Sequence, residues 1–182
     1  MRNIWLISDT HFGHGNIIEY CKRPFSNVWE MNEAIVHNWN TFVKDEDIVY
    51  HLGDVYMGSI SKDDMRSIFL RLKGRKRLIL GNHDNGKDQI LQNHFQKISM
   101  WRLFPEFGLL LTHVPVHDST LGIRVAEDNN KGEQGEVGVE RKPFVNVHGH
   151  IHQNLSPTKM HINVCVEHTN YSPVNIEDLR IR

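Results

Sequence analysis

Residues that can bind metal ions or move protons recur in five short clusters along the chain. In order, the clusters are Asp9-Thr10-His11, Gly53-Asp54, Gly81-Asn82-His83-Asp84, Thr112-His113 and Gly149-His150-Ile151-His152. The chain contains thirteen histidines, and imidazole is both the commonest metal ligand and the usual proton-transfer group near neutral pH. Each cluster alone is a weak signal, because a histidine after a strand is more often a structural residue than a ligand. Their joint occurrence favours a metal site.

The spacing within the clusters indicates how they could hold ions. Asp9 and His11 are two positions apart, as are His150 and His152. In extended backbone such residues point to the same side, so each pair is expected to bind one ion or two neighbouring ions. A carboxylate such as Asp54 can bridge two cations at the separation of about 3.5–4 Å that two-metal phosphatases use.

The donor types narrow the choice of metal. The amide oxygen of Asn82 adds to a mixed oxygen and nitrogen set that suits two divalent ions, manganese first, with iron, zinc or nickel as alternatives. The only cysteines, Cys21 and Cys165, provide no paired thiolate motif, which argues against a closed structural zinc site.

The elements that must position these clusters alternate between strand and helix in the first half of the chain. Apolar segments at 3–8, 47–52 and 77–80 are predicted strands, and each ends at a cluster. Helical spacing of apolar residues predicts helices over 28–42 and from an N-cap at Ser61 to Leu72. This order is typical of an α/β fold in which the ends of strands deliver active groups to one edge.

The second half is predicted to be richer in strands. Segments 97–103, 107–112, 144–148 and 160–166 are strand-like with little helix between them, which indicates a second sheet packed against the first. The 182 residues fit one domain. A polar, glycine-containing stretch over 118–143 is either a surface loop without function or a lid or specificity loop.

Composition excludes several classes of protein. Hydrophobic residues make up 39% and charged residues 24% of the chain, and no apolar run is long enough to span a membrane. The chain enters a strand-like run at its first residues, so no leader and a cytoplasmic location are expected. The net charge of −1 disfavours binding of extended nucleic acid, while a small phosphoester or nucleotide substrate stays possible.

The ordered motifs resemble those of the calcineurin-like metallophosphoesterase superfamily over nearly the whole chain. Within it, the run Ile7-Ser8-Asp9-Thr10-His11-Phe12-Gly13-His14, with Asn16-Ile17-Ile18, Arg23-Pro24-Phe25 and Thr112-His113 followed by Pro115, is similar to a short bacterial and phage-type branch. The resemblance implies a four-layer α/β/β/α sandwich with two mixed β-sheets. That fold agrees with the two sheets expected from the strand pattern.

The resemblance also implies a role for each cluster. It places Asp9, His11 and His152 on one metal and Asn82, His113 and His150 on the other, with Asp54 shared. His83 matches the catalytic histidine of the family, and Asp84 is a candidate to orient neighbouring groups. The implied reaction is phosphoester hydrolysis by a metal-bound hydroxide.

Four further residues near the clusters have open roles. His14, Arg23 and His117 flank ligand motifs and are candidate contacts for a substrate phosphate or base, Arg23 because its planar donor fork suits phosphate. The alternative is that they are ordinary loop residues. His148 would share a face with His150 and His152 on a straight strand, but the Gly-His-x-His pattern favours the last two as ligands.

The sequence after Gly53-Asp54 bears on the substrate. It reads Val55-Tyr56-Met57-Gly58, whereas protein phosphatases of the superfamily continue with Asp-Arg-Gly, so a phosphoprotein substrate is disfavoured. A small phosphodiester or phosphomonoester, such as a nucleotide, is the leading hypothesis. A nuclease acting on short or single-stranded ends is second. A non-catalytic protein-binding scaffold is third, because the scaffold members of the superfamily lack the catalytic histidine that His83 matches.

Overall fold

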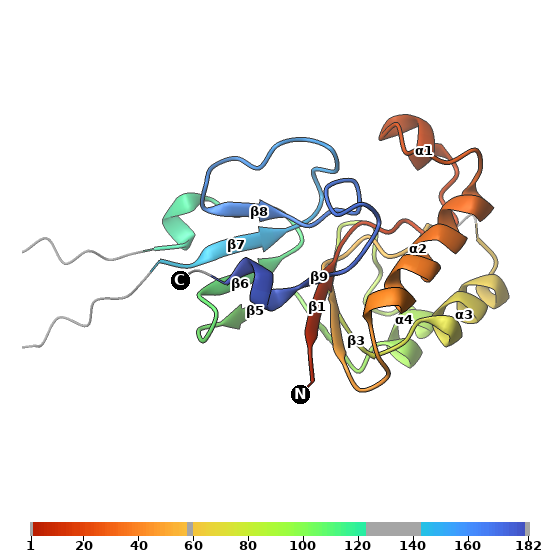
Figure 1. The fold of residues 1–182 in the computed structure, drawn as a ribbon, viewed down its shortest axis with the longest axis horizontal. Coiled ribbons are helices and arrows are strands. Elements are labelled where there is room, and N and C mark those ends of the chain that lie inside the picture. The colour runs from red at the N-terminus through yellow and green to blue at the C-terminus, as the bar shows by residue number, and fades with distance from the viewer. Residues whose placement is uncertain (1, 58–59, 123–142, 181–182) are drawn as a thin grey trace, which may run out of the picture.

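The first of two β-sheets contains the N-terminal half of the chain. The computed structural model describes residues 2–57, 60–122 and 143–180. In Figure 1 the helices lie to the right of the first sheet. Its strand order is β4 (Lys97–Ser99), β3 (Arg75–Ile79), β2 (Ile48–His51), β1 (Ile4–Ile7) and β9 (Val174–Asn175). The strands β1 to β4 are parallel and β9 is antiparallel to β1, so the sheet is mixed.

The second sheet is also mixed. Its order is β5 (Trp101–Phe104), β6 (Leu109–Thr112), β7 (Val145–His148) and β8 (His161–Asn163). The pair β5–β6 is antiparallel, and β6, β7 and β8 are parallel. Five of the parallel strands, namely β1, β2, β3, β6 and β7, end at the predicted clusters.

One expectation for the second half is wrong. Segment 97–103 is not one strand of the second sheet, because β4 pairs with β3 in the first sheet and the chain crosses to the second sheet only after Met100. The helix before β4 returns the chain to the open edge of β3, as a parallel crossover requires. Local apolar content does not reveal which sheet a strand will join.

The helices begin where their capping residues allow. Asn27 accepts a hydrogen bond from the backbone of Glu30 at the start of α2 (Val28–Phe42), and Ser61 caps α3 (Lys62–Arg71) as predicted. The short helices α1 (Asn16–Tyr20) and α4 (Gln89–His94) were not predicted. All four lie on the side of the first sheet (Figure 1). None of the described helices combines the length and apolarity needed to cross a bilayer.

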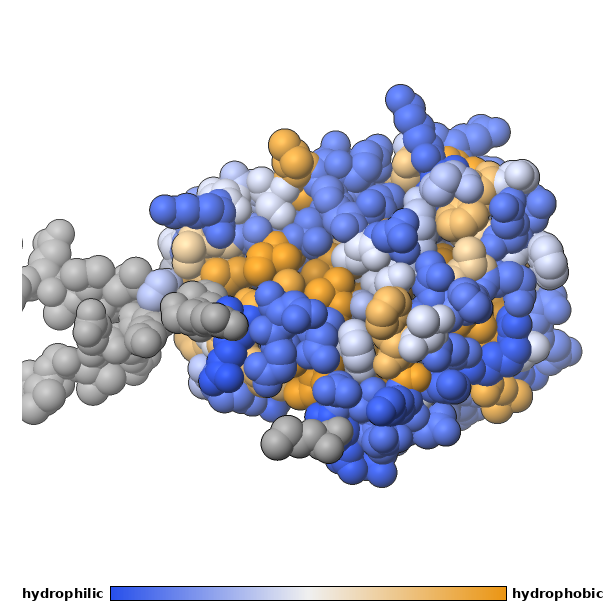
Figure 2. Space-filling view, viewed as in Figure 1, coloured by the Kyte–Doolittle hydropathy of each residue, from blue (hydrophilic) through white to orange (hydrophobic). Residues whose placement is uncertain are grey.

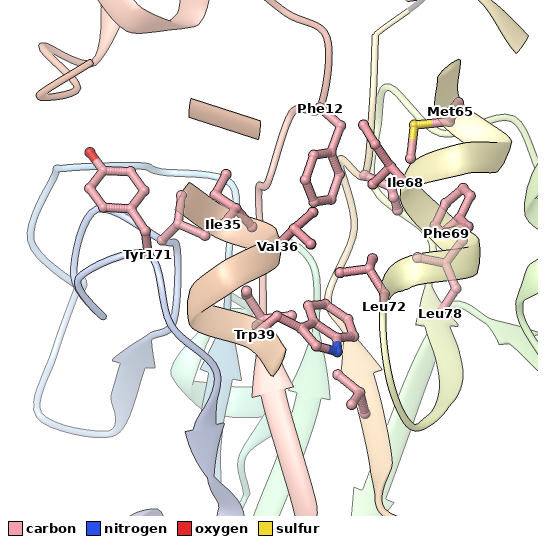
Figure 3. Packing of buried hydrophobic residues seen from close by; sticks show 14 of the residues in the cluster. Phe12, Ile35, Val36, Trp39, Met65, Ile68, Phe69, Leu72, Leu78 and Tyr171 are labelled. Atoms are coloured by element: carbon pink, nitrogen blue, oxygen red, sulfur yellow. The ribbon is translucent and has the colours of Figure 1, made fainter. Parts of the chain in front are cut away.

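The helices are held on the first sheet by one apolar cluster. Figure 3 shows Trp39 and Val36 of α2 facing Leu72 and Ile68 of the α3 region across this core. Trp39 is 1% exposed, and its indole N–H donates to the carbonyl of Lys73. The core therefore includes a satisfied polar group as well as the apolar contacts.

A second apolar cluster joins the two sheets. It includes Leu6 and Tyr50 from the first sheet and Phe104, Leu109 and Val147 from the second. On the face shown in Figure 2, the largest apolar area lies over the second sheet beside the short helix η2 (Ile176–Leu179). The expected α/β fold with two mixed sheets is confirmed, although no α-helix among residues 2–57, 60–122 and 143–180 covers the outer face of the second sheet.

The predicted lid or specificity loop over 118–143 falls only partly within the structure. Residues 118–120 form the short helix η1 (Asp118–Thr120). Residues 123–142 lie outside the described residues, so a lid there stays a prediction.

Candidate metal centre

Loops after β1, β2, β3, β6 and β7 bring the predicted ligands together beyond the ends of these strands. Two groups form, each with its donor atoms within 4.8 Å of one another: Asp9, His11 and His152 in the first, and Asp54, His113 and His150 in the second. Asn82 joins the second group, because its Oδ1 lies 2.9 Å from His113 Nε2. The structure thus brings together all seven side chains that the sequence nominated.

Asp54 lies between the two groups. Its Oδ2 is 3.5 Å from His113 Nε2 in the second group and 3.7 Å from His11 Nε2 in the first. Its other oxygen, Oδ1, accepts a hydrogen bond from the backbone N–H of His83 at 3.0 Å. One oxygen is therefore held by the protein, and the other faces both groups.

The ligand pairs converge through left-handed backbone rather than through extended strands. Positive φ angles occur at Asp9 (58°), His11 (49°), Asp54 (55°), His150 (72°) and His152 (48°). The expectation that extended backbone aligns each pair is therefore wrong. Each such residue costs roughly 1–3 kcal/mol, and such strain persists only where the surrounding structure imposes it. Asp9 and His11 enter the same group, whereas His150 and His152 enter different groups.

Glycines allow the loops to approach each other closely. A Cβ at Gly149 would collide with Ser8 Oγ and Asp9 Oδ2, and one at Gly81 would collide with Asp54 Oδ1. Any side chain at either position would push apart the loops that carry the candidate ligands.

Buried acceptor atoms in the first group fit a bound cation. Asp9 Oδ1 and His11 Nε2 are buried and have no hydrogen-bond partner. Burial raises the pKa of Asp9 and lowers the pKa of His11 to about 2, because removal from water disfavours the charged form of each group. A divalent cation would stabilise the Asp9 carboxylate and accept the lone pair of the neutral imidazole.

The second group has a similar arrangement of lone pairs. His113 Nδ1 lies 2.7 Å from the carbonyl oxygen of Leu52 and donates to it, which leaves Nε2 as an acceptor. Nε2 faces Asn82 Oδ1, a second acceptor, at 2.9 Å. A cation bound by both atoms would satisfy them, and the carbonyl contact orients the ring as in known metal sites.

Asp84 clamps the loops that follow β2 and β3. Its carboxylate accepts hydrogen bonds from the backbone N–H groups of Gly81, Asp54 and Val55 at 2.9–3.0 Å. The predicted orienting contact is therefore present, and it acts on the backbone that carries Asp54 and Asn82.

Arg23 does not lie where a substrate would meet it, which corrects the expectation of a phosphate contact. The residue is 4% exposed. Its guanidinium donates to the carbonyl oxygens of Asp9 and Thr10 and to Glu167 Oε1, at 2.7–3.0 Å. It therefore stabilises the backbone of the loop that follows β1.

Glu167 is a site residue that the sequence did not reveal. Its Oε1 accepts a hydrogen bond from His152 Nδ1 at 3.1 Å in addition to those from Arg23. Burial alone would lower the pKa of His152, but hydrogen bonds to Cys21 and Glu167 outweigh it and raise the pKa to about 10. Glu167 follows a buried strand-like segment without any motif, so only its charge beside apolar residues could have identified it.

The remaining predicted histidines occupy different positions. His14 Nδ1 lies 3.3 Å from His11 Nδ1, so it can orient the His11 ring, and its contact with substrate stays a prediction. His117 is exposed and accepts a hydrogen bond from the backbone of Ser119 in η1, and no described contact joins it to the two groups. His148 is buried and pairs with the carbonyl of Gly149 and with Ser156.

Comparisons with known proteins show what the chain resembles. A family model described as the calcineurin-like phosphoesterase superfamily domain matches residues 2–167. An uncharacterized protein of Methanocaldococcus jannaschii is 37% identical over 97% of this chain and 89% of its own length. The gene 66 protein of Mycobacterium phage L5 is 29% identical over 85% of this chain and 80% of its own length. A solved structure from Aquifex aeolicus, of unknown function, is 27% identical, with a TM-score of 0.72 and 98% coverage of both chains.

The Glu167 contact predicts that metal affinity depends on a residue that is not itself a ligand. Glu167→Gln removes the charge that orients His152, and loss of such partners weakens metal binding by about 10–100-fold. Titration of chelator-stripped protein with Mn²⁺ in a calorimeter measures this, with a thermal melt to check folding. Glu33→Gln makes the same change in the exposed pair with Arg71 and should bind as wild type. Equal affinities in the two variants would contradict the role of Glu167.

His148 predicts a pH dependence of stability in stripped protein. Burial lowers its pKa to about 4 from about 6.5 in the unfolded chain. The resulting stability is present above pH 6.5 and is lost as the pH falls toward 4. His148→Gln should therefore flatten the loss seen in urea unfolding by up to about 1.4 kcal/mol per pH unit. Before stripping, the variant should contain as much metal as wild type. Parallel pH profiles, or loss of a metal, would contradict a purely structural His148.

Proposed function

The chain belongs to the calcineurin-like phosphoesterase superfamily, and from this membership we propose that it hydrolyses phosphodiesters with two divalent cations. The observation that carries the proposal is the position of Asp54, whose Oδ2 faces both groups of candidate ligands. Manganese is the cation proposed first, and iron, zinc and nickel also suit the mixed donors. When bound, the cations would neutralise charge on the phosphoryl oxygens and lower the pKa of water.

The exposure of His83 and its closeness to Asp54 support a role for this residue in acting on the substrate. Its side chain is 47% exposed, and its Nε2 lies 4.0 Å from Asp54 Oδ2. The backbone of His83 is held by Asp54 Oδ1, and the following carboxylate of Asp84 is bound to three backbone N–H groups. A fixed backbone with a solvent-facing imidazole suits a residue that protonates the leaving oxygen.

Two hollows beside His83 favour a diester over a monoester. Asn82 and His113 line a groove of about 710 Å³, and the next residues of the same loop, His83 and Asp84, line a second hollow of about 300 Å³. A diester carries a substituent on each side of phosphorus, whereas a monoester carries only one. The net charge of −1 favours a small diester or nucleotide over extended nucleic acid.

Metal-dependent hydrolysis of bis(p-nitrophenyl) phosphate tests the proposal. Stripped protein should regain diester hydrolysis with Mn²⁺, and Asp54→Asn, which keeps the shape but removes the shared charge, should lose about 10²–10³-fold in turnover. The assay is repeated with Ni²⁺, Zn²⁺ and Mg²⁺ and with p-nitrophenyl phosphate. Cleavage of the monoester alone would contradict the diester proposal, and inactivity of the metal-loaded protein on both esters would favour a scaffold.

A proton-donating role for His83 predicts that the loss of activity in a His83 variant depends on the leaving group of the substrate. His83→Ala should slow hydrolysis of a dinucleotide, whose leaving alkoxide needs a proton, by about 10²–10⁴-fold. The loss on p-nitrophenyl esters should be much smaller, because nitrophenolate leaves without protonation. Metal analysis checks that both ions are retained, and His168→Ala, at an exposed position, should behave as wild type. An equal loss on both substrates would rule out the proton-donor role.

A further inference from the structure

An apolar groove opens directly beside the candidate metal centre. Its volume is about 710 Å³, and its main apolar side chains are Leu80, Met100, Trp101, Leu103, Leu110 and Phe144. The groove also contains Asn82 and His113, the pair of acceptors in the second ligand group. A molecule in the groove would therefore touch the metal centre at one end.

The groove lies on the outer face of the second sheet. In β5, Phe104 is 3% exposed and faces the core between the sheets, so the alternating residues Leu103 and Trp101 are directed to the other side. Register places Trp101 opposite Thr112 and Leu103 opposite Leu110, and all four line the groove. None of the described α-helices covers this face.

Large apolar groups in the groove are left in contact with water. Trp101 is 60% exposed and Met100 is 65% exposed. Folding of the described residues leaves this surface uncovered, and an apolar or aromatic ligand would remove it from solvent. A ligand pocket typically combines such a lining with a few polar groups that fix orientation, as Asn82 and His113 would here.

We propose that this groove binds a planar aromatic group of the substrate, of the nucleobase class, whose phosphate lies at the metal centre. The proposal rests on the proposed phosphodiesterase function and names its substrate class. An exposed indole offers a face on which a base can stack, and stacking of a base on an aromatic side chain is sequence-tolerant. A protein partner seated here would cover Asn82 and His113 and close the site, so continuity with the metal centre favours a substrate group.

Paired ligands that differ only in the base test the proposal. AMP and ribose 5-phosphate are titrated into the Mn²⁺-loaded protein in a calorimeter. Trp101→Ala should weaken AMP binding by about 5- to 150-fold, the range that one stacked base contributes, and leave ribose 5-phosphate binding unchanged. Trp101→Phe, which keeps an aromatic face, should restore most of the affinity for AMP.

Trp29→Ala provides the matched control, because Trp29 is 70% exposed and lies in α2 on the side of the first sheet. It should bind both ligands as wild type. An unchanged AMP affinity in Trp101→Ala, or an equal loss for both ligands, would overturn the proposal. If wild-type protein shows this base-dependent binding but hydrolyses no diester, the groove proposal stands and the proposed function is wrong. If it hydrolyses diesters without base-dependent binding, the proposed function stands and the groove proposal is wrong.

Discussion

The buried carboxylate of Asp9 is the interaction around which the site is arranged. Its Oδ2 accepts hydrogen bonds from Ser8 Oγ, the backbone N–H of His150 and Cys165 Sγ, and its backbone carbonyl accepts one from Arg23. These contacts join the loop after β1 to segments that follow β7 and β8. The remaining oxygen, Oδ1, has no hydrogen-bond partner, and a buried acceptor without one is costly unless a cation binds it.

The strained backbone of the ligand loops follows from the same arrangement. Five of the candidate ligands have positive φ, and none is glycine. Such conformations cost free energy, so the packed sheets and clamps such as Asp84 must hold them. The packing of the chain's own loops thus brings the candidate donor atoms together.

The two faces of the second sheet differ in what covers them. Its inner face buries Phe104, Leu109 and Val147 against the first sheet and so sets the distance between the loops that meet at the metal centre. Its outer face carries Trp101 and Leu103, which the described helices leave uncovered. One strand, β5, thus contributes alternate residues to the core and to the proposed substrate groove.

The sequence by itself determined the elements whose signals are local. The apolar spacing and the cap at Ser61 predicted α3, and the apolar run before Asp9 predicted β1. The ordered clusters identified the family resemblance and, through it, all seven candidate ligands. Only the tertiary structure decided the contacts between segments far apart in the chain. It separated 97–103 between two sheets, buried Arg23 against Glu167, replaced extended backbone with left-handed turns and exposed Trp101 beside Asn82. These outcomes depend on which loops meet, and no local pattern carries that information.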